Sequence, residues 1–240
     1  MSEPIVELRD LTMQFAIERR HYGLKNIVLH LPQYIKDRAN RTMFKALDNV
    51  SLSVNRGERV GLVGHNGCGK TTMLSVIGGV YRRYQGEVYV RGRVSMMLAL
   101  GAGFCHELSG RENIILNGVL QGKTRKEMKA LTDDIIDFAD IGAFIDSPVY
   151  QYSSGMQARL GFGIATAIQP EVLLVDEVMA VGDAAFAEKC ETRIKHLLDG
   201  GTTLFLVSHS MNDIKKYCNR VVRIDHGHII ADGPTDEILS

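Results

Sequence analysis

Two segments near the start of the chain alternate apolar with polar residues, which is typical of strands that bury one face. They cover residues 5–15 (IVELRDLTMQF) and 46–54 (ALDNVSLSV), and we expect them to pair in an antiparallel sheet. The stretch between them, residues 16–42, is basic and has only weak periodicity. We interpret it as an insertion into that sheet.

A different pattern follows, in which continuous apolar runs replace the alternation. The run RVGLVG (59–64) leads through a glycine-rich loop into a helix that begins near Lys70, and two more runs cover residues 172–175 and 203–207. Short continuous runs of this kind are typical of parallel strands that are covered on both faces. Residues 184–198 lie between the last two runs and have helical periodicity. The alternation of strands with helices predicts an α/β core.

The rest of the chain contains a helical segment and a C-terminal hairpin. Residues 111–168 lack strand signals, and we interpret this region as a mainly helical lobe, spanning about 105–168, that is inserted into the core. Residues 220–231 (RVVRIDHGHIIA) predict a hairpin, and Thr235 is expected to cap a last short helix. All 240 residues are expected to form one domain.

Composition and charge narrow the possible classes of protein. With 45% hydrophobic and 23% charged residues the chain can bury a core, and its formal net charge of zero creates no field that would attract nucleic acid or anionic lipid. The four cysteines lack CxxC spacing, so we expect reduced thiols in a cytosolic protein. The N-terminus has no apolar region typical of a secretory signal, and no stretch approaches the roughly 18 apolar residues of a spanning helix. Contact with a membrane is therefore expected to depend on another protein.

Residues 64–71 read GHNGCGKT and match the pattern G-x-x-x-x-G-K-[ST] between a strand and a helix. Glycines let backbone N–H groups wrap phosphates, the start of the helix adds a favourable dipole, Lys70 reaches the β and γ phosphates, and the Thr71 hydroxyl binds Mg²⁺. The pattern therefore predicts a site for ATP and Mg²⁺. The residues assigned to nucleotide binding in and directly after this loop are Gly64, His65, Asn66, Gly67, Cys68, Gly69, Lys70, Thr71 and Thr72.

Acidic residues follow the next apolar run, VLLVDE (172–177). Asp176 is expected beside the metal, and Glu177 is placed to polarise the attacking water as a general base. His209 follows the run at 203–207, at the carboxyl end of a predicted parallel strand, where open α/β sheets bind ligands. An imidazole there would hydrogen-bond the γ-phosphate and hold the water in register with Glu177.

Residues 152–157 (YSSGMQ) open a predicted helix that runs to about Ile168. Two interpretations remain open. Serine and glycine at a helix start are ordinary capping residues, which predicts a well-capped helix. The same residues, Ser153, Ser154 and Gly155, would together with the helix dipole also form an anion site, which would hold the γ-phosphate of a second subunit.

Taken in order, GHNGCGKT, YSSGMQ, VLLVDE and His209 resemble the Walker A, signature, Walker B and H-loop motifs of ABC ATPases, and the resemblance covers nearly the whole chain. It implies a RecA-like P-loop core with an antiparallel β lobe and an inserted helical lobe. It also implies ATP and Mg²⁺ as cofactors, and a homodimer in which each of two ATP molecules lies between the Walker A loop of one subunit and the signature of the other.

Some positions depart from the motifs of that family. The common signature is LSGGQ, but Ser154 occupies the first glycine position and Met156 the glutamine position. Residues 101–113 contain no glutamine where most relatives carry the Q-loop glutamine. His106 and Glu107 are the two candidates for its place.

Two further assignments come from the same resemblance. An aromatic residue at the end of the first strand commonly stacks on adenine in this family, and Phe15 matches that position, with Tyr22 as the alternative. The sequence AVGD stands where the D-loop would be, so Asp183 is a candidate for contacts across the dimer.

The departures from the common motifs, together with the insertion before Ala46, resemble the exporters of bacterial surface polysaccharides of O-antigen, capsule or teichoic acid type. This implies an ATPase at the cytoplasmic face of the inner membrane that works on two copies of a transmembrane permease, which makes most of the contact with the polysaccharide. No nucleic acid is expected as a partner. The alternatives are a soluble ABC ATPase acting on nucleic acid or the ribosome, an exporter of another substrate, and a nucleotide-gated module without turnover, although Glu177 and His209 favour hydrolysis.

Overall fold

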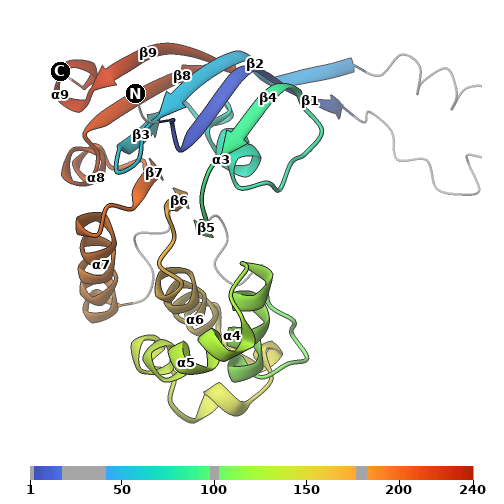
Figure 1. Ribbon diagram of the computed structural model, residues 1–240, viewed down its shortest axis with the longest axis vertical. Helices are drawn as coiled ribbons and strands as arrows, with labels where there is room; N and C mark the ends of the chain where they lie inside the picture. Colours follow the sequence, from blue (N-terminus) through green and yellow to red (C-terminus); the bar gives the residue numbers. More distant parts are fainter. Residues whose placement is uncertain (1–2, 18–41, 98–102, 177–182, 240) are drawn as a thin grey trace, which may run out of the picture.

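The computed structural model describes residues 3–17, 42–97, 103–176 and 183–239. Both sheets lie in the upper part of the view in Figure 1, and a group of helices lies in its lower part. The smaller sheet has the strand order β2–β1–β4, and the larger sheet has the order β5–β6–β7–β3–β8–β9.

The smaller sheet consists of β1 (Val6–Ile17), β2 (Thr42–Val54) and β4 (Gln85–Val90), with β1 antiparallel to both neighbours. The predicted antiparallel pair is therefore confirmed.

Both paired strands extend further than predicted, into the stretch interpreted as an insertion. Phe15 pairs with Phe44 and Ile17 with Thr42, so residues 16–17 and 42–45 belong to strands. Residues 42–45 are exposed, and an exposed strand end has no alternation of buried and polar positions that would predict it. The rest of the expected insertion lies outside the described residues.

The larger sheet has five parallel strands and one antiparallel edge strand, β9. Its strands are β3 (Arg59–Val63), β5 (Val94–Met97), β6 (Val172–Asp176), β7 (Thr203–Val207), β8 (Arg220–Asp225) and β9 (His228–Pro234).

Successive residues of the central strands enter two different apolar clusters. Leu174 and Phe205 pack with residues of the smaller sheet and the helix after β3, whereas Leu173 and Leu204 pack with helices on the other side. A strand covered on both faces has no polar face, which explains the continuous apolar runs and confirms the predicted parallel strands.

Four helices alternate with or follow the strands of this sheet along the chain, and all but α8 were predicted at their observed positions. They are α3 (Lys70–Ile77), α7 (Ala184–Asp199), α8 (Met211–Tyr217) and α9 (Thr235–Ile238). The predicted hairpin is formed by β8 and β9. The predicted capping role of Thr235 is wrong: Pro234 is the N-cap residue, and the Thr235 hydroxyl, in the first turn, donates instead to the carbonyl oxygen of Cys218 at 2.9 Å.

The remaining helices gather at the other end of the molecule (Figure 1), and we call this group the helical lobe. Two of its helices begin with capping boxes, in which Ser109 and Thr124 each exchange hydrogen bonds with a glutamate three residues later. The lobe has its own apolar cluster, which explains why its residues have helical rather than strand periodicity. Its helices are α4 (Gly110–Leu120), α5 (Arg125–Ala139), η1 (Gly142–Asp146), η2 (Val149–Gln151) and α6 (Ser154–Ala167).

Candidate nucleotide-binding site

The glycine-rich loop connects β3 to α3 at the carboxyl end of the central strand. All three glycines of the loop have positive φ angles, and those of Gly64 and Gly69 are 149° and 118°. A Cβ atom at Gly69 would lie 2.5 Å from the carbonyl oxygen of Ala46, and one at Gly64 would overlap the carbonyl oxygen of Ile224. Neighbouring backbone therefore leaves room only for glycine at these two positions, which keeps the loop close to the sheet.

Lys70 is the first residue of α3, and its side chain lies under the loop. The residue is 8% exposed, and its Nζ donates hydrogen bonds to the carbonyl oxygens of Gly64 at 2.8 Å and His65 at 3.0 Å. Its hydrogen bonds to described residues go to these two carbonyl oxygens and to the Cys68 sulfur, and within the described ranges it forms no ion pair with a carboxylate. A buried ammonium group without a neutralising anion creates a positive field at the start of a helix, and both features favour a phosphate there.

Thr71 and Asp176 meet although they are far apart in the chain. The Thr71 hydroxyl donates to Oδ2 of Asp176 at 2.6 Å. Asp176 is the last residue of β6, and one strand, β7, separates β6 from β3, whose loop leads into α3. The hydroxyl and carboxylate oxygens are hard ligands of the kind that Mg²⁺ prefers, so this pair fits the predicted metal position.

An open cavity of about 430 Å³ extends from the loop to the smaller sheet. This volume is within the range of small-molecule sites. Phe15 lines it and packs edge-on against Tyr81, with ring centroids 5.3 Å apart. The residues that line the cavity are Phe15, Phe44, Ala46, Asn66, Gly67, Gly69, Lys70, Thr71, Thr72, Val207 and His209.

Phe44 is a site residue that the sequence did not predict. It pairs directly with Phe15 across β1 and β2, lines the same cavity and is 49% exposed. The aromatic type was visible in the sequence, but the pairing depends on the register of two strands separated by a long connection. The alternative adenine contact, Tyr22, and the predicted general base, Glu177, lie outside the described residues.

Two residues of the loop direct their side chains away from this cavity. Cys68 is 1% exposed and packs in the apolar cluster beneath the loop. His65 instead contacts the turn between β8 and β9, where its Nε2 lies 3.0 Å from Oδ1 of Asp225. Of the predicted loop residues, these two and Gly64 do not line the cavity with the rest.

The signature residues are not brought to the same cavity. Ser153 is the N-cap of α6, and its Oγ accepts a hydrogen bond from the backbone N–H of Met156 at 3.2 Å. Ser154 and Gly155 form the first turn of that helix. They belong to the helical lobe, whereas the cavity lies against α3 and the smaller sheet (Figure 1).

Asp183 is held by contacts within its own chain. It is the N-cap of α7, where its Oδ1 accepts from the backbone N–H of Phe186 at 2.9 Å, and its Oδ2 accepts from Arg159 at 2.8 Å. The Phe186 N–H and, secondarily, the charge of Arg159 hold the pKa of Asp183 below its ordinary value. Arg159 also lies over the Phe186 ring, so it links α6 to the start of α7. The sequence did not predict that Arg159 pairs with Asp183, because the two residues stand on different helices, α6 and α7.

The two candidates for the missing glutamine also lie apart from the cavity. His106 and Glu107 are exposed, and neither is among the described residues that line it. Glu107 accepts a hydrogen bond from the Cys105 thiol at 3.3 Å, and backbone hydrogen bonding lowers its pKa.

Comparison with known proteins agrees with this geometry. The family model for ABC transporters matches residues 47–180. The chain belongs to the ABC transporter family. Membership of this family identifies it as an ABC-type ATPase, as the sequence motifs predicted.

Relatives within the family share about two fifths of their residues with this chain. It is 39% identical to the O-antigen export system ATP-binding protein RfbB of Klebsiella pneumoniae, over 99% of this chain and 96% of that protein. It is 44% identical to the teichoic acids export ATP-binding protein TagH of Levilactobacillus brevis, over 82% of this chain and 54% of that protein.

Solved structures of ABC proteins share the fold at low sequence identity. One is an ATP-binding cassette dimer in a post-hydrolysis state with ADP and phosphate, with a TM-score of 0.73 and 21% identity over 96% of this chain and 98% of that chain. Another is the ATP-binding subunit of an ABC transporter, with a TM-score of 0.76 and 20% identity over 98% of this chain and 91% of that chain. The predicted α/β fold class is confirmed.

Proposed function

We propose that this ABC ATPase works as a homodimer and powers the export of a bacterial surface polysaccharide, of O-antigen or capsule type, through a separate membrane permease. The observation that carries the ATPase part is the convergence of Lys70, Thr71 and Asp176 beside one cavity. The names of the relatives, which include O-antigen and teichoic acid export proteins, support the choice of substrate.

Each residue of the site has a distinct task in this proposal. The loop backbone and Lys70 hold the phosphates, and the aromatic rings of Phe15 and Phe44 hold the base. Thr71 and Asp176 hold Mg²⁺, which when bound neutralises part of the phosphate charge. His209 follows β7 and lines the cavity, and we expect it to hydrogen-bond the γ-phosphate. Glu177 is expected to act as the general base.

The homodimer follows from the separation of the two anion-binding features in one chain. The cavity lies against α3, and the N-terminus of α6 lies in the helical lobe. A second copy would place its Ser153, Ser154 and Gly155 over the open side of the first copy's phosphates. Asp183, already fixed by Arg159, would then contribute to the dimer surface. The cassettes that share this fold include dimers, which supports the same arrangement here.

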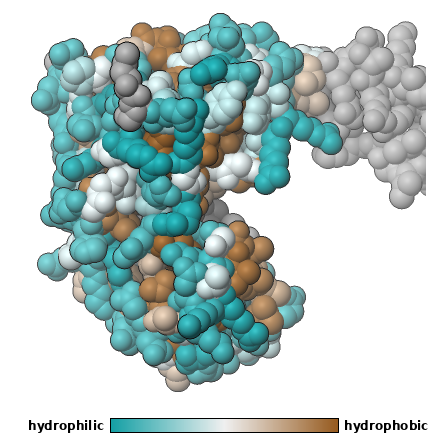
Figure 2. All heavy atoms as spheres, viewed as in Figure 1, coloured by the Kyte–Doolittle hydropathy of each residue, from teal (hydrophilic) through white to brown (hydrophobic). Residues whose placement is uncertain are grey.

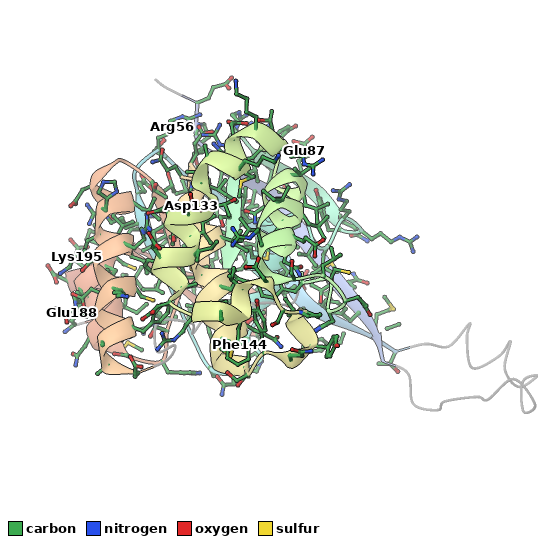
Figure 3. All side chains as sticks on the ribbon, turned by 90° about the horizontal axis from the view of Figure 1, so that it is seen from below. Arg56, Glu87, Asp133, Phe144, Glu188 and Lys195 are labelled. Carbon is green, nitrogen blue, oxygen red and sulfur yellow. The ribbon has the colours of Figure 1, made fainter. Side chains whose placement is uncertain are left out.

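The permease contact is proposed to lie on the helical lobe. No helix in the described ranges is long and apolar enough to cross a bilayer. Figure 2 shows hydrophobic atoms gathered on the side of the lobe where α4 lies. Phe144 and Tyr150 are 50% and 65% exposed, and Figure 3 places Phe144 on the lobe, apart from Glu188 and Lys195 on α7. Large exposed apolar side chains on one region favour a protein partner.

The complete assembly in this proposal contains two copies of this chain and two permease subunits at the cytoplasmic face of the inner membrane. The permease makes most of the contact with the polysaccharide, and no nucleic acid takes part. In this proposal residues 1–240 form a single ABC ATPase domain with a helical lobe of about 105–168, and the insertion is limited to the residues between β1 and β2.

The decisive experiment replaces the gene for this chain in its native cell. Deletion is expected to abolish surface polysaccharide and to leave the polymer inside the cell, and the wild-type chain is expected to restore display. A chain with Glu177→Gln is expected to be produced at the same level without restoring it. Normal display after deletion would remove the assignment to polysaccharide export.

The coupling of ATP hydrolysis to the permease is tested separately, by introducing a charged residue at the proposed permease contact. Tyr150→Asp is expected to leave the ATPase rate of the purified chain within about twofold of wild type while reducing display strongly, because Tyr150 is exposed and away from the cavity. Ile230→Asp on β9 is the control, since Ile230 is 58% exposed and lies on the edge strand of the larger sheet. Equal losses of display in both variants would contradict a contact on the helical lobe.

A further inference from the structure

Three side chains with metal-binding chemistry meet on the outside of the glycine-rich loop. His65 belongs to the loop, Asp225 is the last residue of β8, and His226 follows it in the turn between β8 and β9. Oδ1 of Asp225 lies 3.0 Å from Nε2 of His65 and 3.9 Å from Nε2 of His226. One ligand atom from each of the three residues lies within 4.8 Å of the others.

These separations suit a small divalent cation. Atoms bound to Zn²⁺ at about 2.0–2.1 Å in tetrahedral geometry lie roughly 3.3 Å from one another. The two distances to Asp225 lie on either side of that value, so small rotations of the side chains would complete the geometry. The side chains of His65 and His226 are 48% and 81% exposed, which leaves the site open to an ion and to a water ligand.

The hydrogen bonding of His65 orients its Nε2 towards Asp225. Nδ1 of His65 lies 2.8 Å from the carbonyl oxygen of Asn66, and a carbonyl only accepts, so Nδ1 carries a proton. In the neutral imidazole the other nitrogen, Nε2, then has a lone pair, which faces a carboxylate oxygen. Either a proton on Nε2 or a metal cation bound by both atoms satisfies this pair, and His226 offers a third ligand to a metal ion. A backbone carbonyl on the distal nitrogen is also the usual way in which proteins orient a histidine ligand.

The backbone holds the turn against the loop, so the three residues do not depend on their side chains to stay together. The N–H of Gly227 donates to the carbonyl oxygen of Cys68 at 3.0 Å, and the N–H of Asp48 donates to the carbonyl oxygen of Gly227 at 2.9 Å. His226 and Gly227 are the two central residues of the turn, with φ angles of 44° and 81°. Such turns favour Asn before Gly, and histidine is another residue that adopts a positive φ, so His226 fits the turn without strain.

We propose that His65, Asp225 and His226 form a Zn²⁺ site that fastens the phosphate-binding loop to the β8–β9 turn. Two imidazoles and one carboxylate favour Zn²⁺ over Mg²⁺, because Mg²⁺ prefers oxygen ligands. The site is separate from the oxygen pair of Thr71 and Asp176, and His65 does not line the nucleotide cavity. Zn²⁺ bound here therefore acts on the loop from outside and does not occupy the position of the nucleotide.

The experiment uses the full chain without a histidine tag, in buffer that contains Mg²⁺ in large excess. Zn²⁺ affinity is measured by competition with a chromophoric chelator, and Co²⁺ is used as a spectroscopic probe of tetrahedral coordination. The wild-type chain is expected to bind one Zn²⁺. At a free concentration of 100 times the Kd, the ion is expected to raise Tm by roughly 5–10 °C.

His226→Asn is the informative variant, because asparagine suits the turn and removes one ligand. It is expected to fold like wild type without metal and to weaken Zn²⁺ binding roughly 100-fold, and Asp225→Asn is expected to do the same. His228→Asn is the matched control on the same hairpin, since His228 lies 4.0 Å from Asp48 and outside the three-residue cluster.

None of these measurements depends on ATPase activity or on polysaccharide export, so they test the metal site alone. A wild-type chain that binds no Zn²⁺ under these conditions would overturn the proposal. So would unchanged affinity in His226→Asn, or an equal loss in His228→Asn.

Discussion

Two regions of the molecule offer chemistry to an anion, and they are built in different ways. At the nucleotide cavity, Lys70, Thr71 and Asp176 come from the start of α3 and the end of β6, and residues of both sheets line the cavity. At the start of α6, Ser153, Ser154 and Gly155 are consecutive residues of one helix end. The first region is assembled by tertiary structure, and the second exists wherever that helix forms.

The difference concerns how much of each site one chain supplies. The cavity has a buried ammonium group, a hydroxyl–carboxylate pair and aromatic walls. The helix end has a cap whose serine oxygen already accepts a backbone hydrogen bond, and no charged side chain stands among its three residues. A dipole and a few N–H groups bind an anion weakly alone. The cavity is therefore expected to bind nucleotide in a single subunit, and the helix end to act only when a second subunit supplies the phosphate.

The largest expected effect comes from removing the charge at the cavity. Lys70→Ala is expected to lower kcat/KM for ATP roughly 1000-fold and to abolish tight binding of ATP, because the buried ammonium group at the glycine-rich loop is lost. Glu177→Gln is expected to bind ATP and barely hydrolyse it. Equilibrium binding of a fluorescent ATP analogue beside a steady-state ATPase assay distinguishes the two. If Lys70→Ala retained wild-type affinity, the cavity would not be the nucleotide site.

The next effect isolates the metal position within the same cavity. Thr71→Val keeps the shape of the side chain but removes the hydroxyl that reaches Asp176, and it is expected to reduce the ATPase rate roughly 10- to 100-fold and to raise the Mg²⁺ concentration needed for half-maximal rate. Thr71→Ser retains the hydroxyl and is expected to stay close to wild type. A Mg²⁺ titration of the three proteins is the measurement, and equal behaviour of the valine and serine variants would contradict the metal role.

A smaller effect tests the helix end without disturbing its cap. Aspartate and asparagine both cap helices well, so Ser153→Asp and Ser153→Asn are expected to have thermal stabilities like that of wild type. The aspartate places a negative charge where the second subunit's phosphate would bind. It is expected to weaken ATP-dependent dimerisation at least about tenfold, whereas the asparagine is not. Sedimentation in the Glu177→Gln background with ATP and Mg²⁺ measures this. Equal dimerisation of both variants would mean that α6 binds no phosphate.

The smallest effect is a pH dependence near the same helix. The pKa of Asp183 is lowered in the folded chain, mainly by the N–H of Phe186 and also by Arg159, so its ionised form is favoured by folding. Its stabilising contribution is present above the pKa of the unfolded chain, near 4, and is lost as pH falls through the lower folded value. Asp183→Asn, which keeps a capping side chain, is therefore expected to be slightly less stable than wild type at pH 7 and equal to it in strong acid. Urea unfolding from pH 7 down to pH 2 measures the free energy of unfolding of both proteins. If the difference between them stayed constant across that range, the ionisation of Asp183 would not be its cause.

The sequence by itself determined the elements and the local chemistry of the site. Continuous apolar runs predicted β3, β6 and β7, alternation predicted the pairing of β1 with β2, and the loop motif predicted where phosphate chemistry stands. Ser153 as the cap of α6 was also predictable. In each case the signal is local, because burial of a strand face, a glycine conformation and a helix cap depend on residues within a few positions.

Only the tertiary structure decided which distant residues meet. Thr71 and Asp176 are 105 positions apart and touch because the strand order β6–β7–β3 differs from their order in the chain. Phe44 faces Phe15 through the register of two strands, and His65 meets Asp225 because β3 and β8 are neighbours. Apolar periodicity reports whether a residue is buried, but not what lies against it. That depends on how the strands pair and pack, and pairing is a property of the whole fold.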